Sequence, residues 1–420
     1  MKINSAADGA SEYAISERMR AQIRSLNQAA DNTQNAGALL RVAEGAVMSS
    51  LDILRVMKER AIDSANDTNT DLDRQIMQKE FEQFVDQLDA NANVTYNGKY
   101  LLDGSKKFAG KGATSVYVNL DIYGGATSGT QGLLLIRKQD DPTSGAASYP
   151  YRVVVPGDTV TINGVRDGES FSSTVTVVNN SNPVWDDLMN GVWGRYTPTN
   201  ASATAGGYYD YFGHYIKERF GTPEYNKQGA RVAGPMAQSS SVGLDDAING
   251  FSFVVYDKDG NRKEDATKTL NNFKHLQFAE DPSEDNAMTF HIGAKSNETI
   301  KIGLKDMRSR QLGLRDSEGK AVQITTRDKA EAVISALDNA IQFALDQQTY
   351  IGAVQARLDH TADNLTIASE NASKSESTIR DADMAKEMTE YTKNNVLLQA
   401  SQSMLAQENQ NMSSVLSLLQ

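Results

Sequence analysis

The sequence predicts an α+β protein: an elongated antiparallel helical bundle, formed by both chain ends, with inserted β-rich domains. All eight prolines lie between residues 105 and 325. The same region holds 22 of the 30 aromatic residues, whereas residues 326–420 contain a single glycine, Gly352. Proline breaks helix interiors and aromatic residues favour strands. We therefore expect a helical arm over 1–104, a β-rich region over 105–325, a second helical arm over 326–375 and a terminal helix over 376–420.

The first arm has the periodicity of one long helix over about residues 10–66. Asp8 or Ser11 is the candidate N-cap, and apolar residues then recur at steps of three and four. A rod of this length cannot bury its apolar stripe on itself. Thr70 to Asp73 has the pattern of a capping box, so a second helix is expected to start near residue 72 and to fold back antiparallel.

The last arm is expected to begin after the cap-like residues 325–328, with a stripe that starts at Val333 and Leu337. A second cap-like stretch predicts a break or kink near residues 371–375. In the middle region, alternating apolar and polar residues predict strands. These strands are expected at 115–120, 151–155 and 251–256, with a hairpin turn at 257–261.

Composition excludes several functional classes. The net charge of −12 disfavours nucleic acid as a partner, because phosphate backbones are also anionic. No apolar run approaches the ~20 residues that a membrane helix needs, so no membrane insertion is expected. The first residues contain no apolar segment typical of a secretory signal. The absence of cysteine excludes disulfides, thiolate metal sites and cysteine nucleophiles.

The sequence contains no recognisable catalytic or metal-binding pattern. The four histidines (His214, His275, His291 and His360) include no pair at i, i+4, so a zincin-type site is not expected. Asp257, Asp259 and Asn261 lack the glycine and glutamate of a calcium loop and are better explained as a turn. An aromatic cluster near His214 is compatible with a sugar-stacking platform, although core packing is the simpler explanation. Its members are Tyr208, Tyr209, Tyr211, Phe212 and Tyr215.

Both arms carry segments that resemble bacterial flagellin. The first arm contains Ile3-Asn4-Ser5-Ala6-Ala7-Asp8, Ala14-Ile15-Ser16-Glu17-Arg18 and Leu26-Asn27-Gln28-Ala29. The last arm contains Ile379-Arg380-Asp381-Ala382-Asp383, Met404-Leu405-Ala406-Gln407 and Val415-Leu416-Ser417-Leu418-Leu419. These matches lie at opposite ends in the right order and cover roughly half of the chain. The middle corresponds to the variable surface domains of that family.

The resemblance implies a structural subunit that self-assembles into the extracellular flagellar filament for motility, without catalysis, cofactor or metal. It implies as partners other flagellin subunits, a flagellar export chaperone and the filament cap protein. Export without a cleaved signal peptide is also implied. The candidate residues for packing in the filament core are Leu398, Met404, Leu405, Val415 and Leu419.

Other interpretations stay open at this point. A cell-surface adhesin or glycan-binding protein on a flagellin-like base is the alternative from a different class, and a glycan array distinguishes it. The hook–filament junction protein has similar end helices but generally diverges from an ending of the Met404-Leu405-Ala406-Gln407 type. An inserted protease is disfavoured because residues 105–325 lack metal-ligand spacing.

The resemblance also points to a host-facing surface. Flagellins detected by the innate Toll-like receptor carry a Leu-Gln-Arg-Val-Arg-Glu-Leu-Ala-Val element in the first-arm helix, which matches residues 54–62 here. Val56 replaces its central arginine, Arg60 replaces its second leucine, and Gln87 replaces a glutamate of the following helix. We expect weakened receptor signalling, partly compensated by Arg55. The candidate receptor-facing positions are Arg55, Val56, Glu59, Arg60 and Gln87.

The start of the chain gives a last expectation. Flagellins usually have some tens of residues before the Ile-Asn-x-Ala-x-Asp element, and these form a helix that pairs with the C-terminal one. Met1 lies directly against that element, so the chain resembles a flagellin without this segment. We therefore expect residues 376–420 to be mobile or only partly helical in the monomer, because an isolated helix is marginal in water. We also expect the chain not to build filaments alone.

Overall fold

The computed structural model describes most of the chain as two compact units. The first unit comprises residues 1–35, 291–300 and 358–420, and the second comprises 36–290 and 301–357. No helix among the described residues is long and apolar enough to cross a membrane. The described residues are 1, 3–119, 122–123, 135–136, 151–152, 154, 157–176, 236–238, 242–245 and 247–418.

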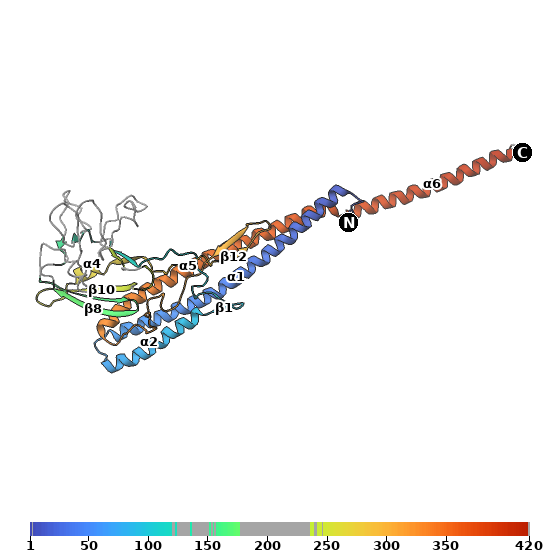
Figure 1. Cartoon of the computed structure of the whole chain (residues 1–420). Helices are drawn as coiled ribbons and strands as arrows, with labels where there is room; N and C mark the ends of the chain where they lie inside the picture. Colours follow the sequence, from blue (N-terminus) through green and yellow to red (C-terminus); the bar gives the residue numbers. More distant parts are fainter. Residues whose placement is uncertain are drawn as a thin grey trace, which may run out of the picture. The chain divides into compact units, whose positions relative to one another are not determined.

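Four long helices come from the two proline-free ends of the chain (Figure 1). They are α1 (Ala10–Ser64), α2 (Asp71–Ala92), α5 (Arg327–Arg380) and α6 (Met384–Leu418). The predicted capping box is confirmed, because the Thr70 side chain accepts from the backbone of Asp73 while the Asp73 side chain accepts from the backbone of Thr70. Thr326 Oγ1 accepts from the Lys329 amide at 3.4 Å, which confirms the cap at the start of α5.

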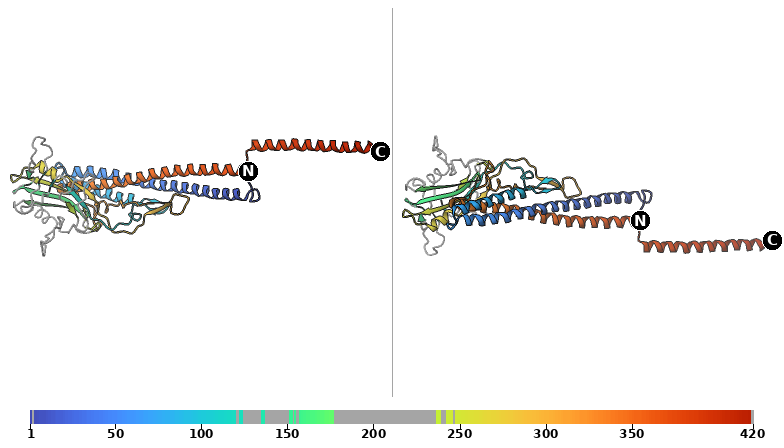
Figure 2. Two further views of the ribbon diagram at one scale, coloured as in Figure 1. Left: turned by 90° about the horizontal axis from the view of Figure 1, so that it is seen from above. Right: turned by 90° about the horizontal axis from the view of Figure 1, so that it is seen from below.

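The helical core of the second unit follows a heptad pattern. Along the part of α1 in this unit, fully buried residues recur at alternating steps of four and three: Ala36, Leu40, Ala43, Val47, Ser50, Leu54, Met57 and Ala61. Such spacing keeps one seam of the helix facing its neighbours. Phe81 and Leu88 of α2 and Val333 and Leu337 of α5 are buried equally completely. Figure 2 shows α1 and α5 side by side in both views.

Three three-stranded antiparallel sheets lie among the described residues of the second unit, one of them formed by the two-residue strands β4, β5 and β6 in the order β4-β5-β6. The sheet with the longest strands has the order β10-β7-β8, and the next has the order β11-β3-β9. Gly250 of β10 lies against α5, where an added Cβ would come within 2.5 Å of the Ala336 amide nitrogen. The strands are β3 (Val116–Asn119), β7 (Thr159–Arg166), β8 (Glu169–Thr176), β9 (Met236–Gln238), β10 (Ile248–Tyr256) and β11 (Phe273–Gln277).

The remaining elements are short. They are β1 (Thr95–Tyr96), β2 (Lys99–Tyr100), β4 (Ile122–Tyr123), β5 (Leu135–Ile136), β6 (Tyr151–Arg152), α4 (Glu264–Leu270), β12 (Met288–His291) and β13 (Thr299–Ile302). The strands predicted near 115–120 and 251–256 are confirmed as β3 and β10, whereas only residues 151–152 of the third form a described strand. The turn at 257–261 leads to a single bridge, Tyr256 to Arg262, and then to α4 rather than to a second strand.

The first unit corrects two predicted helix boundaries. Asp8 does not cap α1, because its Oδ2 accepts from the amides of Asn4 at 3.0 Å and Ser5 at 2.8 Å. The break predicted near residues 371–375 is wrong, since α5 continues through them to Arg380. Ser375 instead donates to the Asn371 carbonyl within the helix at 2.8 Å. The break lies at residues 381–383, where Asp383 Oδ1 accepts from the Ala385 amide at 2.9 Å and caps α6.

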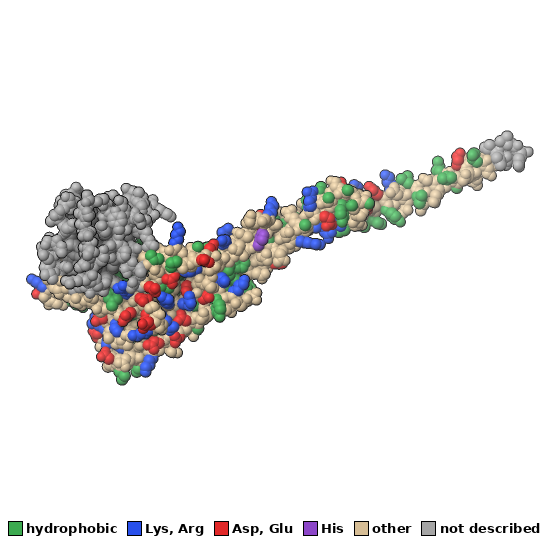
Figure 3. Space-filling view, viewed as in Figure 1, with side chains coloured by type: hydrophobic (Ala, Val, Ile, Leu, Met, Phe, Trp, Pro, Cys, Tyr) green, Lys and Arg blue, Asp and Glu red, His purple; other side chains and the backbone are tan. Residues whose placement is uncertain are grey.

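The C-terminal helix is more complete than the sequence predicted. α6 is continuous to Leu418, so the expectation of only partial helicity is not met by the structure. Its backbone hydrogen bonds are internal to the helix, and every side chain from residue 383 to 413 is exposed. Figure 3 shows hydrophobic side chains spread along this helix. The mobility of α6 in the monomer stays a prediction.

Candidate functional site

The functional features of the described residues are surfaces and junctions rather than a reaction centre. No group of three or more His, Asp or Glu side chains in the described part of the chain is placed to hold a metal ion. His214 and the tyrosine cluster around it lie outside the described residues. The candidate features are exposed apolar side chains, buried charged groups and the cavity of the second unit.

The candidate receptor-facing positions come together on the antiparallel pair of α1 and α2. Two cross-helix hydrogen bonds set their register: Asn91 donates to Ser49 at 3.0 Å, and Arg60 Nε donates to Glu80 Oε1 at 3.2 Å. Arg55, Val56 and Glu59 lie on α1 between these two links, and Gln87 lies on the facing stretch of α2. The structure therefore places the five predicted residues on one pair of helices.

The exposure of these positions differs in a way that matters for binding. Arg55, Val56, Glu59 and Gln87 are exposed, whereas Arg60 is half-buried and engaged by Glu80. Arg55 Nη1 also donates to Asp52 Oδ1 on the same helix at 2.9 Å. Each arginine would have to leave or share a carboxylate in order to contact a partner. Val56 presents a methyl surface at the position where the matched element of receptor-detected flagellins has an arginine.

The predicted filament-core residues are exposed where the structure describes them. Leu398 is 57 % exposed, Leu405 64 % and Met404 72 %. The side chain of Val415, and Leu419 altogether, lie outside the described residues. Sequence reasoning about packing in the filament core did not name Val396 and Leu397, which are 59 % and 53 % exposed on the same helix. Large apolar side chains exposed along one helix mark a surface that a partner covers.

A buried arginine organises the junction between α5 and α6 in the first unit. Arg380 is 7 % exposed, and its Nη1 donates to Glu17 Oε1 at 2.8 Å. Its guanidinium also lies 5.8 Å from the centroid of the Tyr13 ring, and its carbonyl accepts from the Ile3 amide at 3.5 Å. Hydrogen bonds from Arg380 and then from Arg20 hold the pKa of Glu17 below its usual value. The sequence alone identified this arginine only as part of the flagellin-like segment 379–383 and assigned it no role.

A cavity of about 650 Å³ lies in the second unit between β11 and α5. His275 and Phe278 line one side, and Phe343 of α5 lines the other. The imidazole of His275 lies 3.8 Å from the Phe278 ring centroid and 4.6 Å from that of Tyr117. Burial among these rings lowers the pKa of His275 to about 4, because the charged form loses its hydration. Burial likewise raises the pKa of Tyr117, whose hydroxyl donates to the Ile248 carbonyl at 3.0 Å.

The family models and the similar proteins all point to the same family. Residues 1–107 match the model of the bacterial flagellin N-terminal helical region, and residues 334–419 match that of the C-terminal helical region. The flagellin of Clostridium tyrobutyricum is 32 % identical over 411 residues, covering 98 % of this chain and 90 % of that relative. The flagellin of Bacillus subtilis (strain 168) is 28 % identical, covering 100 % of this chain and 89 % of that relative.

A solved structure was also found. Flagellar hook-associated protein-3 of Legionella pneumophila aligns with a TM-score of 0.38 at 13 % identity, covering 87 % of this chain and 99 % of that one. The relationship to flagellins rests on the sequence matches at the two ends and over the full length.

Proposed function

Because the chain belongs to the bacterial flagellin family, and is a non-catalytic structural subunit that self-assembles into the flagellar filament, we propose that α6 supplies its filament-core contacts. The observation that supports this is the exposure of Leu398, Met404 and Leu405 on a continuous helix. An isolated helix gains most of its stability from packing an apolar face. Assembly would supply that packing. The sequence prediction adds Val415 and Leu419 to the proposed contact residues.

Co-sedimentation tests this role of α6. The full chain is mixed with sheared flagellar filaments as seeds, and incorporation is measured in the pellet and by electron microscopy. We expect Leu398→Asp and Leu405→Asp to abolish incorporation, because each places a carboxylate in an apolar contact. The matched control is Asn395→Asp, which adds the same charge at an exposed polar position of the same helix. Equal incorporation of Leu398→Asp and the control would reject the proposal.

We further propose that an export chaperone covers α6 before assembly, that the filament cap protein receives it, and that export proceeds without a cleaved signal peptide. The exposed apolar side chains of α6 support the first point, since such a surface favours association in the cell. Mass spectrometry of the secreted chain tests the export proposal: the N-terminal residue should be unchanged from the intracellular form.

The proposed domain division follows the same roles. Residues 1–104 and 326–375 would form the bundle arms, 105–325 the outer domains and 376–420 the terminal helix.

We also propose that the α1–α2 face binds the host Toll-like receptor weakly. Val56 lacks the charge and donors that make arginine a frequent interface anchor. Arg60 is occupied by Glu80, so its use by a receptor would first require breaking that contact. Arg55 is exposed one position away and provides partial compensation.

A further inference from the structure

The cavity of the second unit has an apolar interior and a charged entrance. Phe343 is 3 % exposed, and the Phe278 ring packs edge-on against it with centroids 4.9 Å apart. Lys274, Lys305 and Asp346 also line the cavity with exposed side chains. The volume of about 650 Å³ falls within the range of pockets that enclose sizeable groups. It has room for more than one large side chain.

Three charges at the entrance have no ionic partner within the described residues. The other charged side chains are already paired: Lys107 with Glu280, Asp338 with Lys58, and Asp306 with Arg308. Lys305 Nζ lies 5.2 Å from the Phe343 ring centroid. Asp346 accepts a hydrogen bond from Gln342 but forms no ion pair in the described part of the chain. The cavity therefore offers two ammonium groups and one carboxylate around an aromatic interior.

The first turns of α2 present the complementary surface. Leu72 is 67 % exposed and Ile76 is 59 % exposed, and a spacing of four residues places them on one face. The Asp71 side chain beside them is 86 % exposed and accepts one hydrogen bond, from Arg74 Nη1 at 3.2 Å, so its carboxylate can still accept from a partner. Lys79 lies one turn beyond Ile76. We call residues 71–79 the α2 knob. Its two exposed apolar side chains are flanked by the Asp71 carboxylate and the Lys79 ammonium group, while Asp73 is engaged in the capping box with Thr70 and Arg74 is buried.

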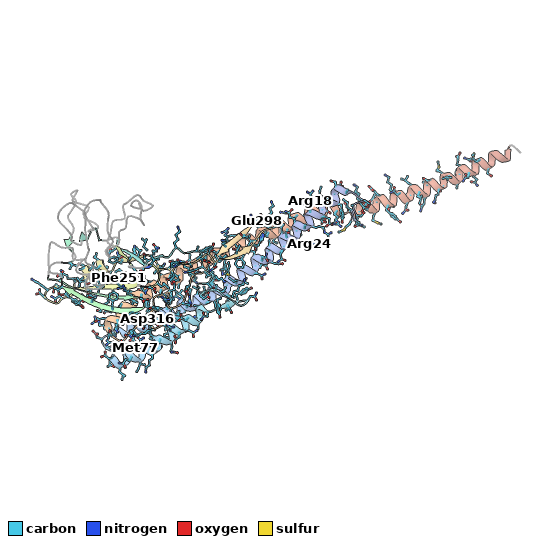
Figure 4. The ribbon with its side chains drawn as sticks, viewed as in Figure 1. Arg18, Arg24, Met77, Phe251, Glu298 and Asp316 are labelled. Atoms are coloured by element: carbon cyan, nitrogen blue, oxygen red, sulfur yellow. The ribbon has the colours of Figure 1, made fainter. Side chains whose placement is uncertain are left out.

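The knob and the cavity lie on different faces of the second unit. Figure 4 shows Met77 of α2 apart from Phe251 of β10 in the second unit. Lys58 and Arg60 of α1, two residues apart and so on different sides of that helix, contact Asp338 of the cavity and Glu80 of α2 respectively. Phe251 packs on Tyr117, whose ring in turn contacts His275 of the cavity wall. One copy therefore cannot fill its own cavity with its own knob. Contacts between two different faces repeat from copy to copy and build an open assembly instead of closing as a dimer.

We propose that the α2 knob of one copy inserts Leu72 and Ile76 into the cavity of a second copy. Asp71 then meets Lys274 and Lys305, while Lys79 meets Asp346. Burial of two exposed apolar side chains against Phe278 and Phe343 drives the contact, and the charge pairs set its direction. The inference rests on the self-assembly of this chain and adds a specific contact to it.

Cysteine cross-linking tests the contact. The chain contains no cysteine, so the introduced thiols are the only ones that can react. The double variant Leu72→Cys/Leu276→Cys places one thiol on the knob and one on the exposed rim of the cavity. Filaments that contain the full-length variant, formed with sheared seeds, are treated with a short bismaleimide. We expect a ladder of dimers, trimers and longer products on a denaturing gel. The matched control is Leu72→Cys/Lys258→Cys, whose second thiol lies on the exposed turn after β10 and should give no ladder.

Charge reversal supplies the second test. Lys274→Glu/Lys305→Glu in the cross-linking variant should reduce the ladder roughly tenfold, because like charges across an interface suppress association. Asp71→Lys should restore it. Incorporation into filaments is measured separately by sedimentation, so failure of the subunit function is seen as the absence of incorporated chain. Incorporated chain with no ladder above the control, products that stop at the dimer, or a ladder unaffected by charge reversal would each overturn the proposed contact.

Discussion

Arg380 donates to Glu17 across 2.8 Å and thereby ties the end of α5 to the first turns of α1. The arginine is buried and the glutamate is half-exposed, so the pair lies at the edge of the first unit's packing. The same guanidinium contacts the Tyr13 ring. The junction between α5 and α6 is therefore held by a defined side-chain network at the point where the chain leaves one helix and enters the next.

The first prediction concerns this network. Arg380→Ala should destabilise the protein by about 1–3 kcal/mol, because it removes a buried side chain together with its hydrogen bonds. Urea unfolding followed by circular dichroism measures the change, with exposed Arg18→Ala as the control. Equal stability of Arg380→Ala and Arg18→Ala would contradict the proposed role of this network.

The Glu17 carboxylate gives the same network a pH dependence. The pKa of Glu17 is lowered in the folded protein, so its contribution to the free energy of unfolding is present above its ordinary pKa and is lost as pH falls through the lowered value. Glu17→Gln should therefore reduce the decrease in unfolding free energy at acid pH.

The second prediction concerns the heptad seam of α1. Leu54→Ala should cost about 2–5 kcal/mol, because Leu54 is completely buried and its removal leaves a cavity. Val56→Ala, two residues away on the same helix and 37 % exposed, should stay within about 0.5 kcal/mol of the wild type. Chemical denaturation of both variants gives the comparison. Similar losses for the two would show that the seam has been assigned to the wrong face.

The third prediction is a pH dependence that originates at His275. Its pKa is about 4 in the folded protein and 6.5 in the reference state, so the unfolded chain binds the proton first as pH falls. Stability should therefore decrease from pH 6.5 toward pH 4, by at most about 3 kcal/mol from this group. His275→Gln should flatten that part of the curve. Unfolding free energies at intervals between pH 4.5 and 7 provide the measurement, and an unchanged slope in the variant would refute the assignment.

The fourth prediction concerns host recognition. Val56→Arg/Arg60→Leu should raise receptor signalling roughly tenfold, because it restores one anchor and releases Glu80 from its partner. Reporter cells that carry the receptor measure the half-maximal dose. Lys258→Arg, on the exposed turn after β10 and outside the matched element, is the control for an added guanidinium. Signalling by the unaltered chain equal to that of a motif-complete flagellin would refute the weakening.

The sequence predicted the helices well because their signals are local. The helix expected over about residues 10–66 runs from Ala10 to Ser64, and the capping box at Thr70 marks the start of α2 as expected. The hairpin of β7 and β8 was missed although its signal is present: Asp167-Gly168, both at positive φ, separates two alternating stretches. The break at residues 381–383 was misplaced because Ser373 and Ser375 have cap-like side chains but lie within a helix.

Features that depend on long-range packing were beyond such reasoning. The pairing of β10 with β7, and of β3 with both β9 and β11, joins segments far apart in the chain. The cavity exists because β11 lies opposite α5, which no periodicity of either segment indicates. The ion pair between Arg60 and Glu80 could not be predicted either, because it depends on the register between α1 and α2.

If α6 is an assembly surface, amide hydrogen exchange across residues 397–418 should differ between the monomer and the filament. In the monomer these amides should exchange rapidly, because the helix buries none of its described side chains. In filaments that contain the chain they should become strongly protected, while the amides around Leu54 and Leu88 stay protected in both states. Strong protection of residues 397–418 already in the monomer, or none gained in the filament, would contradict the account.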